Sequence, residues 1–188
     1  MNLPKDKMPE TEVSLRLAFY LISNNLAPEV GVSIDGAQVK TNDTIHFPIM
    51  EFLTSNGWRA TVVRESFQGS YLHSSFPAKI EIDSNSGKGD VVAKLFKGKM
   101  LRVECKKEPI ERSKSSQEYA LLHEAIGQLV TVSEVDNNDL LAVAVPSSAK
   151  FNDLIKRWRD APLIKKFAIL LLTVDRGNNV DGFPISRK

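Results

Sequence analysis

The chain has 188 residues, of which 42% are hydrophobic and 26% are charged, enough for one well-buried domain and short for two. We therefore expect a single domain over residues 1–188. Lysine and arginine number 25 against 23 for aspartate and glutamate, so the net charge of +2 neither requires nor excludes a nucleic acid partner.

Several classes of protein are excluded by simple counts. Residues 1–12 lack the apolar core of a signal peptide, and the longest apolar run, Phe167 to Leu172, is too short to span a bilayer, which predicts a cytoplasmic protein without a membrane segment. The only cysteine, Cys105, leaves no disulfide and no cysteine cluster for zinc, and the three histidines show no metal-ligand spacing. A bound metal would therefore have carboxylate ligands, which favour Mg²⁺ or Mn²⁺.

Helices and strands alternate in the first half of the chain. Apolar spacing and the Pro9 start predict a helix from Glu10 to Asn24. The polar, serine-rich segment 65–77 is predicted to be a loop. The remaining elements expected here are a strand over 32–40 with a turn at Asp35-Gly36, a helix over 45–55, and strands over 60–64 and 79–83.

The second half continues this alternation. The segment 118–132 has a broad apolar face and predicts a helix, and 151–159 predicts another. The runs 139–146 and 167–175 are almost entirely apolar, which is typical of strands covered on both faces. The sequence therefore predicts a mixed α/β domain whose central sheet is flanked by helices.

Between these halves, the stretch from Gly89 to Pro109 predicts a β-hairpin. With a three-residue tip at 97–99, every apolar residue meets an apolar partner, for instance Val91 with Cys105 and Ala93 with Val103. A two-residue Lys-Gly turn would mix polar and apolar residues on both faces. The three-residue tip places one polar set on the opposite face: Asp90, Glu104 and Lys106.

These three side chains suggest a hydrolytic metal site. Cross-strand neighbours lie about 5 Å apart and diagonal neighbours about 7–8 Å apart at their Cβ atoms, so the carboxylates of Asp90 and Glu104 can converge on one cation. Such a cation activates a water and stabilises charge on a scissile phosphate. Lys106, on the same face, would orient that water or neutralise the phosphate.

The acid at one strand start, followed by acid-x-Lys in the next strand, resembles the PD-(D/E)XK nuclease superfamily. Here the motif falls on Asp90 and on Glu104-Cys105-Lys106, with Gly89 where the family name has proline. The resemblance covers roughly 58–146. It implies a restriction-endonuclease-like core with an additional N-terminal helix and strand, Mg²⁺ or Mn²⁺ as cofactor, and the backbone carbonyl of Cys105 as a further metal ligand.

Two further site residues are implied by the same resemblance. Members of the superfamily often carry a glutamine on the helix after the hairpin, which points to Gln128, and a glutamate on the helix before the first core strand. The helix over 45–55 offers Glu51 and His46 for that second role. Glu12 would take it instead if the first helix packs beside the hairpin, and the sequence does not choose among them.

The resemblance implies a metal-dependent phosphodiesterase acting on DNA, as an endonuclease or exonuclease, in restriction, repair or defence. A nuclease that cuts both strands of a duplex would favour a homodimer. The alternatives are an RNA-directed nuclease and a catalytically inactive module that binds nucleic acid or protein. Basic residues near the hairpin are expected to contact phosphates, namely Lys94, Lys97, Lys99, Arg102 and Lys107.

Overall fold

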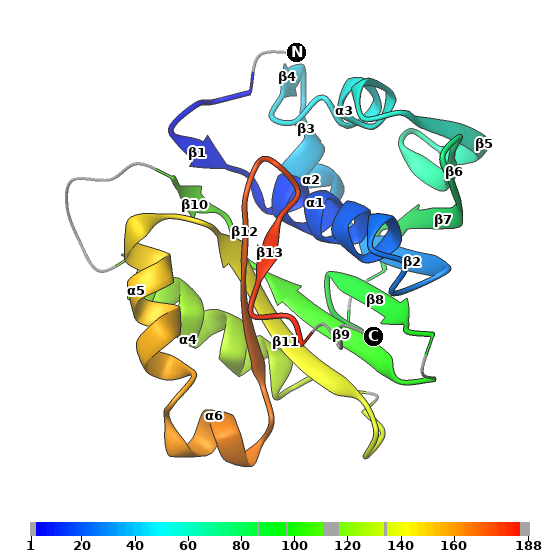
Figure 1. The fold of residues 1–188 in the computed structure, drawn as a ribbon. Coiled ribbons are helices and arrows are strands. Elements are labelled where there is room, and N and C mark those ends of the chain that lie inside the picture. The colour runs from blue at the N-terminus through cyan, green and yellow to red at the C-terminus, as the bar shows by residue number, and fades with distance from the viewer. Residues whose placement is uncertain (1–2, 86, 97, 111–116, 134, 185–188) are drawn as a thin grey trace.

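A computed structural model describes residues 3–85, 87–96, 98–110, 117–133 and 135–184. Within these ranges the chain forms a nine-stranded mixed sheet (Figure 1). From one edge to the other, the strands are β13 (Val180–Asp181), β12 (Leu170–Val174), β11 (Leu140–Pro146), β9 (Met100–Cys105), β8 (Val91–Lys94), β2 (Glu29–Ser33), β7 (Phe76–Asp83), β6 (Gln68–His73) and β5 (Trp58–Glu65).

Helices cover the two faces of this sheet (Figure 1). One face packs against α1 (Glu10–Ser23), and on the other α4 (Gln117–Leu129) and α5 (Ala149–Trp158) cover β9, β11 and β12. The shorter elements are α2 (Gly36–Val39), α3 (Ile49–Ser55), α6 (Pro162–Lys166) and two small pairs, β1 (Lys7–Met8) with β10 (Glu108–Pro109) and β3 (Lys40–Thr41) with β4 (Thr44–Ile45). The mixed α/β class predicted from sequence is confirmed.

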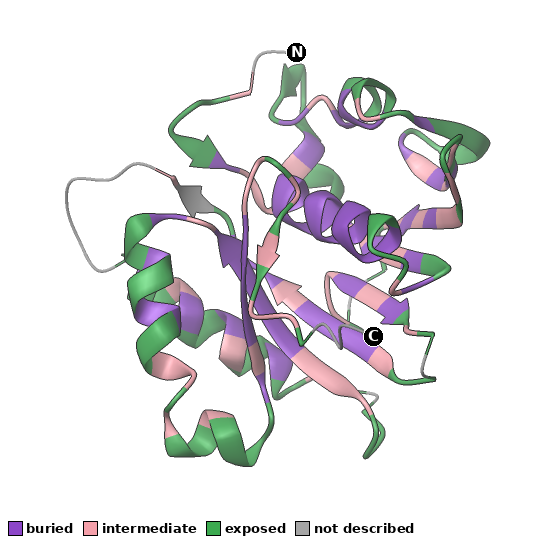
Figure 2. Ribbon diagram, viewed as in Figure 1, coloured by how far each residue is buried: buried purple, intermediate pink, exposed green. Residues whose placement is uncertain are grey.

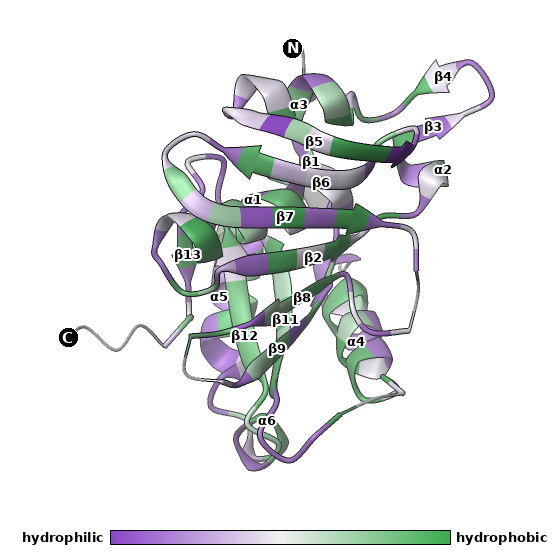
Figure 3. Ribbon diagram, turned by 90° about the vertical axis from the view of Figure 1, so that its right-hand side faces the viewer, coloured by the Kyte–Doolittle hydropathy of each residue, from purple (hydrophilic) through white to green (hydrophobic). Residues whose placement is uncertain are grey.

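The apolar core has two layers separated by the sheet. Along β11, Ala142 and Ala144 join the layer around α1, whereas Val143 and Val145 join the layer under α4 and α5. This strand is buried on both faces, as its uninterrupted apolar sequence predicted. By contrast, hydrophobic and hydrophilic residues alternate along β7, one face of which is open (Figure 3).

Helix α1 is the most deeply buried helix of the fold (Figure 2). Every residue from 11 to 22 is buried, including two charged ones, Glu12 and Arg16. Their side chains form an ion pair of 2.8 Å, and Arg176, from the turn after β12, adds a second contact to Glu12 at 3.1 Å. Burial of these charges is therefore compensated by direct pairing.

Several predicted elements need correction. The segment 65–77 is not a loop: β6 lies within it, because Gly69 and Tyr71 turn inward while the strand pairs with β5 and β7 on its two sides. The strand predicted over 32–40 ends at Ser33. Asp35 does not make a turn but caps α2, its carboxylate accepting a hydrogen bond of 2.9 Å from the Ala37 N–H.

The pairing of the β8–β9 hairpin also differs from the prediction. Val91 lies opposite Val103 and Ala93 opposite Leu101, a shift of two residues along β9. The tip is displaced because Phe96 leaves the ladder, donates its N–H to the Leu26 carbonyl and exposes its ring. A shift of two residues keeps every side chain on its predicted face, so the apolar and polar faces are confirmed although the pairs are wrong.

No helix in the described part of the chain is both long enough and apolar enough to cross a bilayer.

Candidate active site

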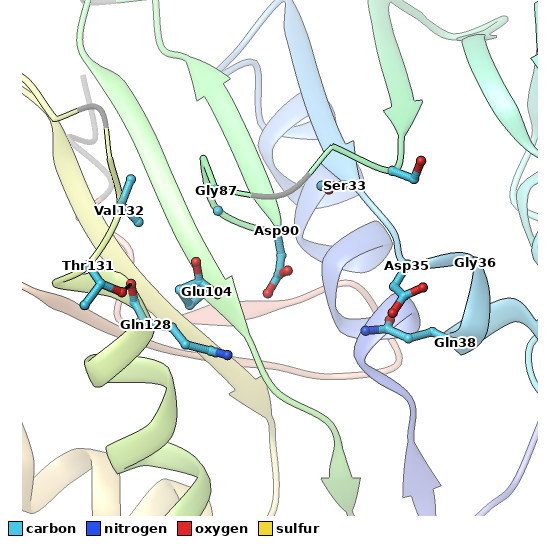
Figure 4. A pocket seen from close by; sticks show the side chains of 12 residues that line it. Ser33, Asp35, Gly36, Gln38, Gly87, Asp90, Glu104, Gln128, Thr131 and Val132 are labelled. Carbon is cyan, nitrogen blue, oxygen red and sulfur yellow. Dashed lines mark hydrogen bonds between the residues drawn. The ribbon is translucent and has the colours of Figure 1, made fainter.

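The polar face of the hairpin brings Asp90 and Glu104 together where β8 begins and β9 ends (Figure 4). The Asp90 N–H donates to the Val103 carbonyl at 2.8 Å, and the Asp90 carboxylate accepts a 2.7 Å hydrogen bond from the Cys105 N–H. The two side chains are close enough for each carboxyl group to influence the pKa of the other. The two acids predicted from the motif are therefore adjacent.

Gly89 allows this close approach of the two strands. Its φ of +100° lies in the left-handed region, which side chains other than glycine rarely adopt. A Cβ atom at this position would lie 3.1 Å from the Val103 carbonyl oxygen. The local backbone of this chain therefore requires glycine at position 89, the position at which the PD-(D/E)XK motif has proline.

Both carboxyl groups hold their protons more tightly than usual. The pKa of Asp90 is raised to about 6, mainly by burial and also by the charge of Glu10. The hydrogen bond from the Cys105 N–H acts in the opposite direction and lowers this pKa. Burial and the neighbouring Asp90 charge raise the pKa of Glu104 to about 7. Near neutral pH the pair therefore shares protons, and a cation would have to displace them to bind.

Lys106 is buried beside this pair, with only 5% of its surface exposed. Its ammonium group lies 3.1 Å from a carboxylate oxygen of Glu124 on α4 and 3.9 Å from one of Glu10 on α1. Burial alone would lower the pKa of Lys106, but these carboxylates outweigh it and the net shift is upward. Lys106 is therefore held as a cation between the two helices.

The first helix contributes Glu10 to the cluster, not Glu12. The Glu12 carboxylate is fully buried and is occupied by Arg16 and Arg176. Glu10, the first residue of α1, instead faces Lys106. The side-chain amide of Gln38 on α2 donates a hydrogen bond of 2.8 Å to the Glu10 carboxylate. Sequence reasoning missed Glu10, Glu124 and Gln38, because they reach the hairpin from separate helices.

A cleft of about 680 Å³ opens over the two acids. Gln128 lines it, as predicted, and Figure 4 shows its side chain extending from α4 into the cleft below Glu104. The lining carries three acidic groups and, in the described part of the chain, no lysine or arginine. Its members are Ser33, Asp35, Gly36, Gln38, Ser84, Gly87, Gly89, Asp90, Glu104, Gln128, Thr131 and Val132.

The remaining predicted residues fall in different places. Arg102 is buried and pairs with Asp139 at 3.0 Å, so its guanidinium group is not exposed for the phosphate contact expected of it. Lys94, Lys99 and Lys107 are exposed, the first two near the hairpin tip, and Lys97 lies outside the described residues. Glu51 lies on α3, which packs at β5, three intervening strands from β8.

His46 and Cys105 complete the account of predicted residues. His46 precedes α3 and donates its N–H to Val39 of α2, and it is absent from the described lining of the cleft. The Cys105 thiol is buried on the apolar face, and burial raises its pKa well above the ordinary value. Its N–H points to Asp90, and since the N–H and C=O of one strand residue face the same neighbour, its carbonyl lies on that side too.

The donor set fits a hard divalent cation. Mg²⁺ commonly takes one or two protein carboxylates and fills its other positions with water and substrate phosphate, as Asp90 and Glu104 beneath an open cleft would allow. Among the described residues, no three His, Cys, Asp or Glu side chains form a ready-made metal-binding group. A cation held here would thus depend on two carboxylates, a backbone carbonyl, water and substrate.

Comparison of the chain with protein-family models, with curated proteins and with solved structures finds no match.

Proposed function

We propose that this protein is a Mg²⁺- or Mn²⁺-dependent phosphodiesterase that hydrolyses DNA. The observation that carries the proposal is the adjacency of Asp90 and Glu104 in the lining of an open cleft, with Lys106 buried beside them and paired to Glu10 and Glu124. Full deprotonation of Asp90 and Glu104 would leave more negative than positive charge there, which is costly unless a cation accompanies it.

The topology around the cluster supports a restriction-endonuclease-like core. Helix α1 directly precedes β2, which pairs with β8 in antiparallel orientation, and β8 pairs likewise with β9. After β9 come α4 and then β11, which lies parallel to β9. The helix and strand that follow the hairpin are the order that the PD-(D/E)XK resemblance implies, and the packing of α1 beside the hairpin makes α1 the candidate to supply a glutamate.

Each site residue would have a separate role in hydrolysis. Mg²⁺, when bound, supplies a polarised water and neutralises charge on the phosphate. Asp90 and Glu104 hold the cation, Lys106 orients the water or neutralises the phosphate, and Gln128 supports the bound groups from α4. The water oxygen bonds to phosphorus as the bond to the leaving sugar oxygen breaks, that oxygen takes a proton, and one water is consumed.

The test is cleavage of plasmid, linear duplex, single-stranded DNA and RNA with Mg²⁺ or Mn²⁺. Wild-type protein is expected to cleave DNA, and Asp90→Asn and Lys106→Met to lose at least about a hundredfold in rate. Asp90→Asn should keep the wild-type melting temperature, whereas Lys106→Met should lower it because Glu10 and Glu124 lose their cation, so its rate is measured at a temperature where it is folded. Lys156→Met, which removes an exposed lysine of α5, is the matched control and should cleave normally.

Two results would contradict the proposal. One is folded protein that cleaves no nucleic acid with any divalent cation, and the other is a Lys106→Met variant as active as wild type. Retention of DNA without cleavage would favour the inactive binding module, and preference for RNA the RNA-directed nuclease.

A further inference from the structure

The strand β5 forms one edge of the nine-stranded sheet, and its outer side carries no further strand in the described part of the chain. Figure 3 shows it as the outermost strand, beside α3. Of its eight residues only Trp58 is buried, and residues 59–65 are all exposed. Such an edge presents backbone N–H and C=O groups with which another strand can pair.

Exposed apolar side chains gather on both faces of this edge. Val62 and Val63, at the centre of β5, have 51% and 53% of their surface exposed. Leu72 of β6, also exposed, shares the open face of the sheet with Val62. Met50 of α3, likewise exposed, lies on the other face with Val63, and its sulfur accepts a hydrogen bond of 3.2 Å from the Tyr71 hydroxyl. Exposed apolar side chains at a free sheet edge are typical of a surface that binds another chain.

The charges of β5 are arranged symmetrically about this apolar centre. Arg59 lies three residues before Val62, and Glu65 lies three residues after it. Two bulges, one on each side of Val62, bring all three side chains onto the open face, where they lie opposite alternate residues of β6. Within the described ranges neither Arg59 nor Glu65 forms an ion pair with another residue. The edge therefore carries positive, apolar and negative side chains in equal steps along one face.

We infer that this edge binds a second copy of the chain, with the two β5 strands antiparallel about a two-fold axis at Val62. Arg59 then lies opposite the partner's Glu65 at both ends of the contact, and Val62 meets the partner's Val62. A two-fold interface requires this self-complementarity, because each contact is made twice. The pairing joins two sheets into one and buries the apolar centre of both edges. This inference does not depend on the proposed nuclease function.

The first test is the oligomeric state of the wild-type protein, measured by sedimentation equilibrium at low ionic strength, where exposed charges are least screened. One pair of strands is a small interface, so a reversible monomer–dimer equilibrium is expected at concentrations up to about 200 µM. A protein that stays monomeric over this whole range would overturn the inference.

Charge reversal tests whether the dimer forms through β5. Arg59→Glu places two carboxylates opposite each other at both ends of the contact, and Glu65→Arg places two guanidinium groups there. Each variant alone is expected to raise the dissociation constant of the dimer about tenfold or more. An equal mixture of the two variants should recover the wild-type value, because each mixed dimer has two attractive pairs.

Lys156→Glu is the matched control, since it makes the same change of charge at an exposed lysine of α5 and should leave the dissociation constant unchanged. The substituted positions are exposed, so all three variants should keep the wild-type melting temperature. Single variants that dimerise as the wild type does, or a mixture that does not recover the dimer, would overturn the antiparallel pairing of β5.

Discussion

Two glutamates at the start of α1, two residues apart, have opposite surroundings. Glu12 is buried against two guanidinium groups, those of Arg16 and Arg176, so positive charge exceeds negative charge around it. Glu10 belongs to a group in which four carboxylates share Lys106. The negative charge of Glu12 is fully compensated by the arginines, and we call its cluster the complete one. The carboxylates around Lys106 outnumber the positive charge, and we call their cluster the incomplete one.

This difference distinguishes a cluster with a structural role from the one that we propose to be functional. Arg176 also donates to the carbonyls of Pro4 and Lys7, so the complete cluster fastens the N-terminal segment to the turn after β12. The incomplete cluster carries carboxyl groups whose pKa is raised, a pattern concentrated at functional sites. A substitution should therefore cost stability in the first cluster and activity in the second.

The largest effect is expected for Glu104→Gln. The amide keeps the shape of the side chain but cannot bind a cation as a carboxylate does, so DNA cleavage should fall by about a thousandfold. The melting temperature without metal should stay the same or rise at pH 8, because a buried charge is removed. Cleavage rates and thermal unfolding on the same preparation check both statements, and a loss of stability equal to that of Glu12→Gln would contradict them.

Glu12→Gln should show the reverse pattern. Removing the charge leaves Arg16 and Arg176 without their buried partner, which is expected to lower the free energy of unfolding by about 3 kcal/mol. Cleavage at temperatures where the variant is folded should remain near the wild-type rate. Urea unfolding measures the first quantity.

Glu81→Gln is the matched control for that change. Glu81 pairs with the exposed Arg64 and Lys79 on the open face of β7, where it is half-buried, and its loss should cost less than about 1 kcal/mol. A cost for Glu12→Gln no greater than this would show that the buried cluster is not what holds α1 in place.

The hairpin shows what the sequence can predict and where it stops. Side-chain alternation identified the apolar face through Val91, Ala93 and Val103 correctly, since burial of one face restricts the register. Registers that differ by two residues bury the same side chains, so alternation could not choose between them. The position of Phe96 determines the register. Its N–H donates to the carbonyl of Leu26, which lies far away in the sequence.

The helix acid that lies beside Lys106, Glu10, was not among the candidates from sequence for a related reason. Residues 11 to 22 of α1 are all buried, so the helix has no exposed stripe from which its orientation could be read. Glu10 and Glu12 lie about 200° apart around the helix axis and point to different neighbours. Only the arginine from the distant turn after β12 showed which glutamate is structural.

A smaller effect is expected at Glu124, which positions Lys106 from α4. Glu124→Gln keeps an oxygen that can accept from Lys106 but removes the charge, and should lower kcat about tenfold without changing the Mg²⁺ concentration required. The control is Asp153→Asn, which breaks an exposed pair with Arg157 at 3.1 Å on α5 and should leave kcat unchanged. Equal rates for Glu124→Gln and wild type would exclude a positioning role.

The smallest expected effect is a pH dependence of stability in the metal-free protein. Because the pKa values of Asp90 and Glu104 are raised to about 6 and 7, the folded state binds more protons than the unfolded state between about pH 4 and pH 7. The contribution of this pair to stability is therefore complete below about pH 4 and is lost as the pH rises through 7.

Urea unfolding in chelator at pH 5.5 and pH 8 measures that loss. It should amount to about 1 to 2 kcal/mol, reduced by solvent screening because Glu104 is partly exposed. Glu104→Gln should show a smaller difference between the two pH values, and saturating Mg²⁺ should reverse most of the loss at pH 8, since it binds only the deprotonated pair. The opposite outcome is that the free energy of unfolding of the wild-type protein rises from pH 5.5 to pH 8 and that Glu104→Gln behaves identically. In that case Asp90 and Glu104 are not an incompletely neutralised pair, and the cluster does not differ in this way from the one around Glu12.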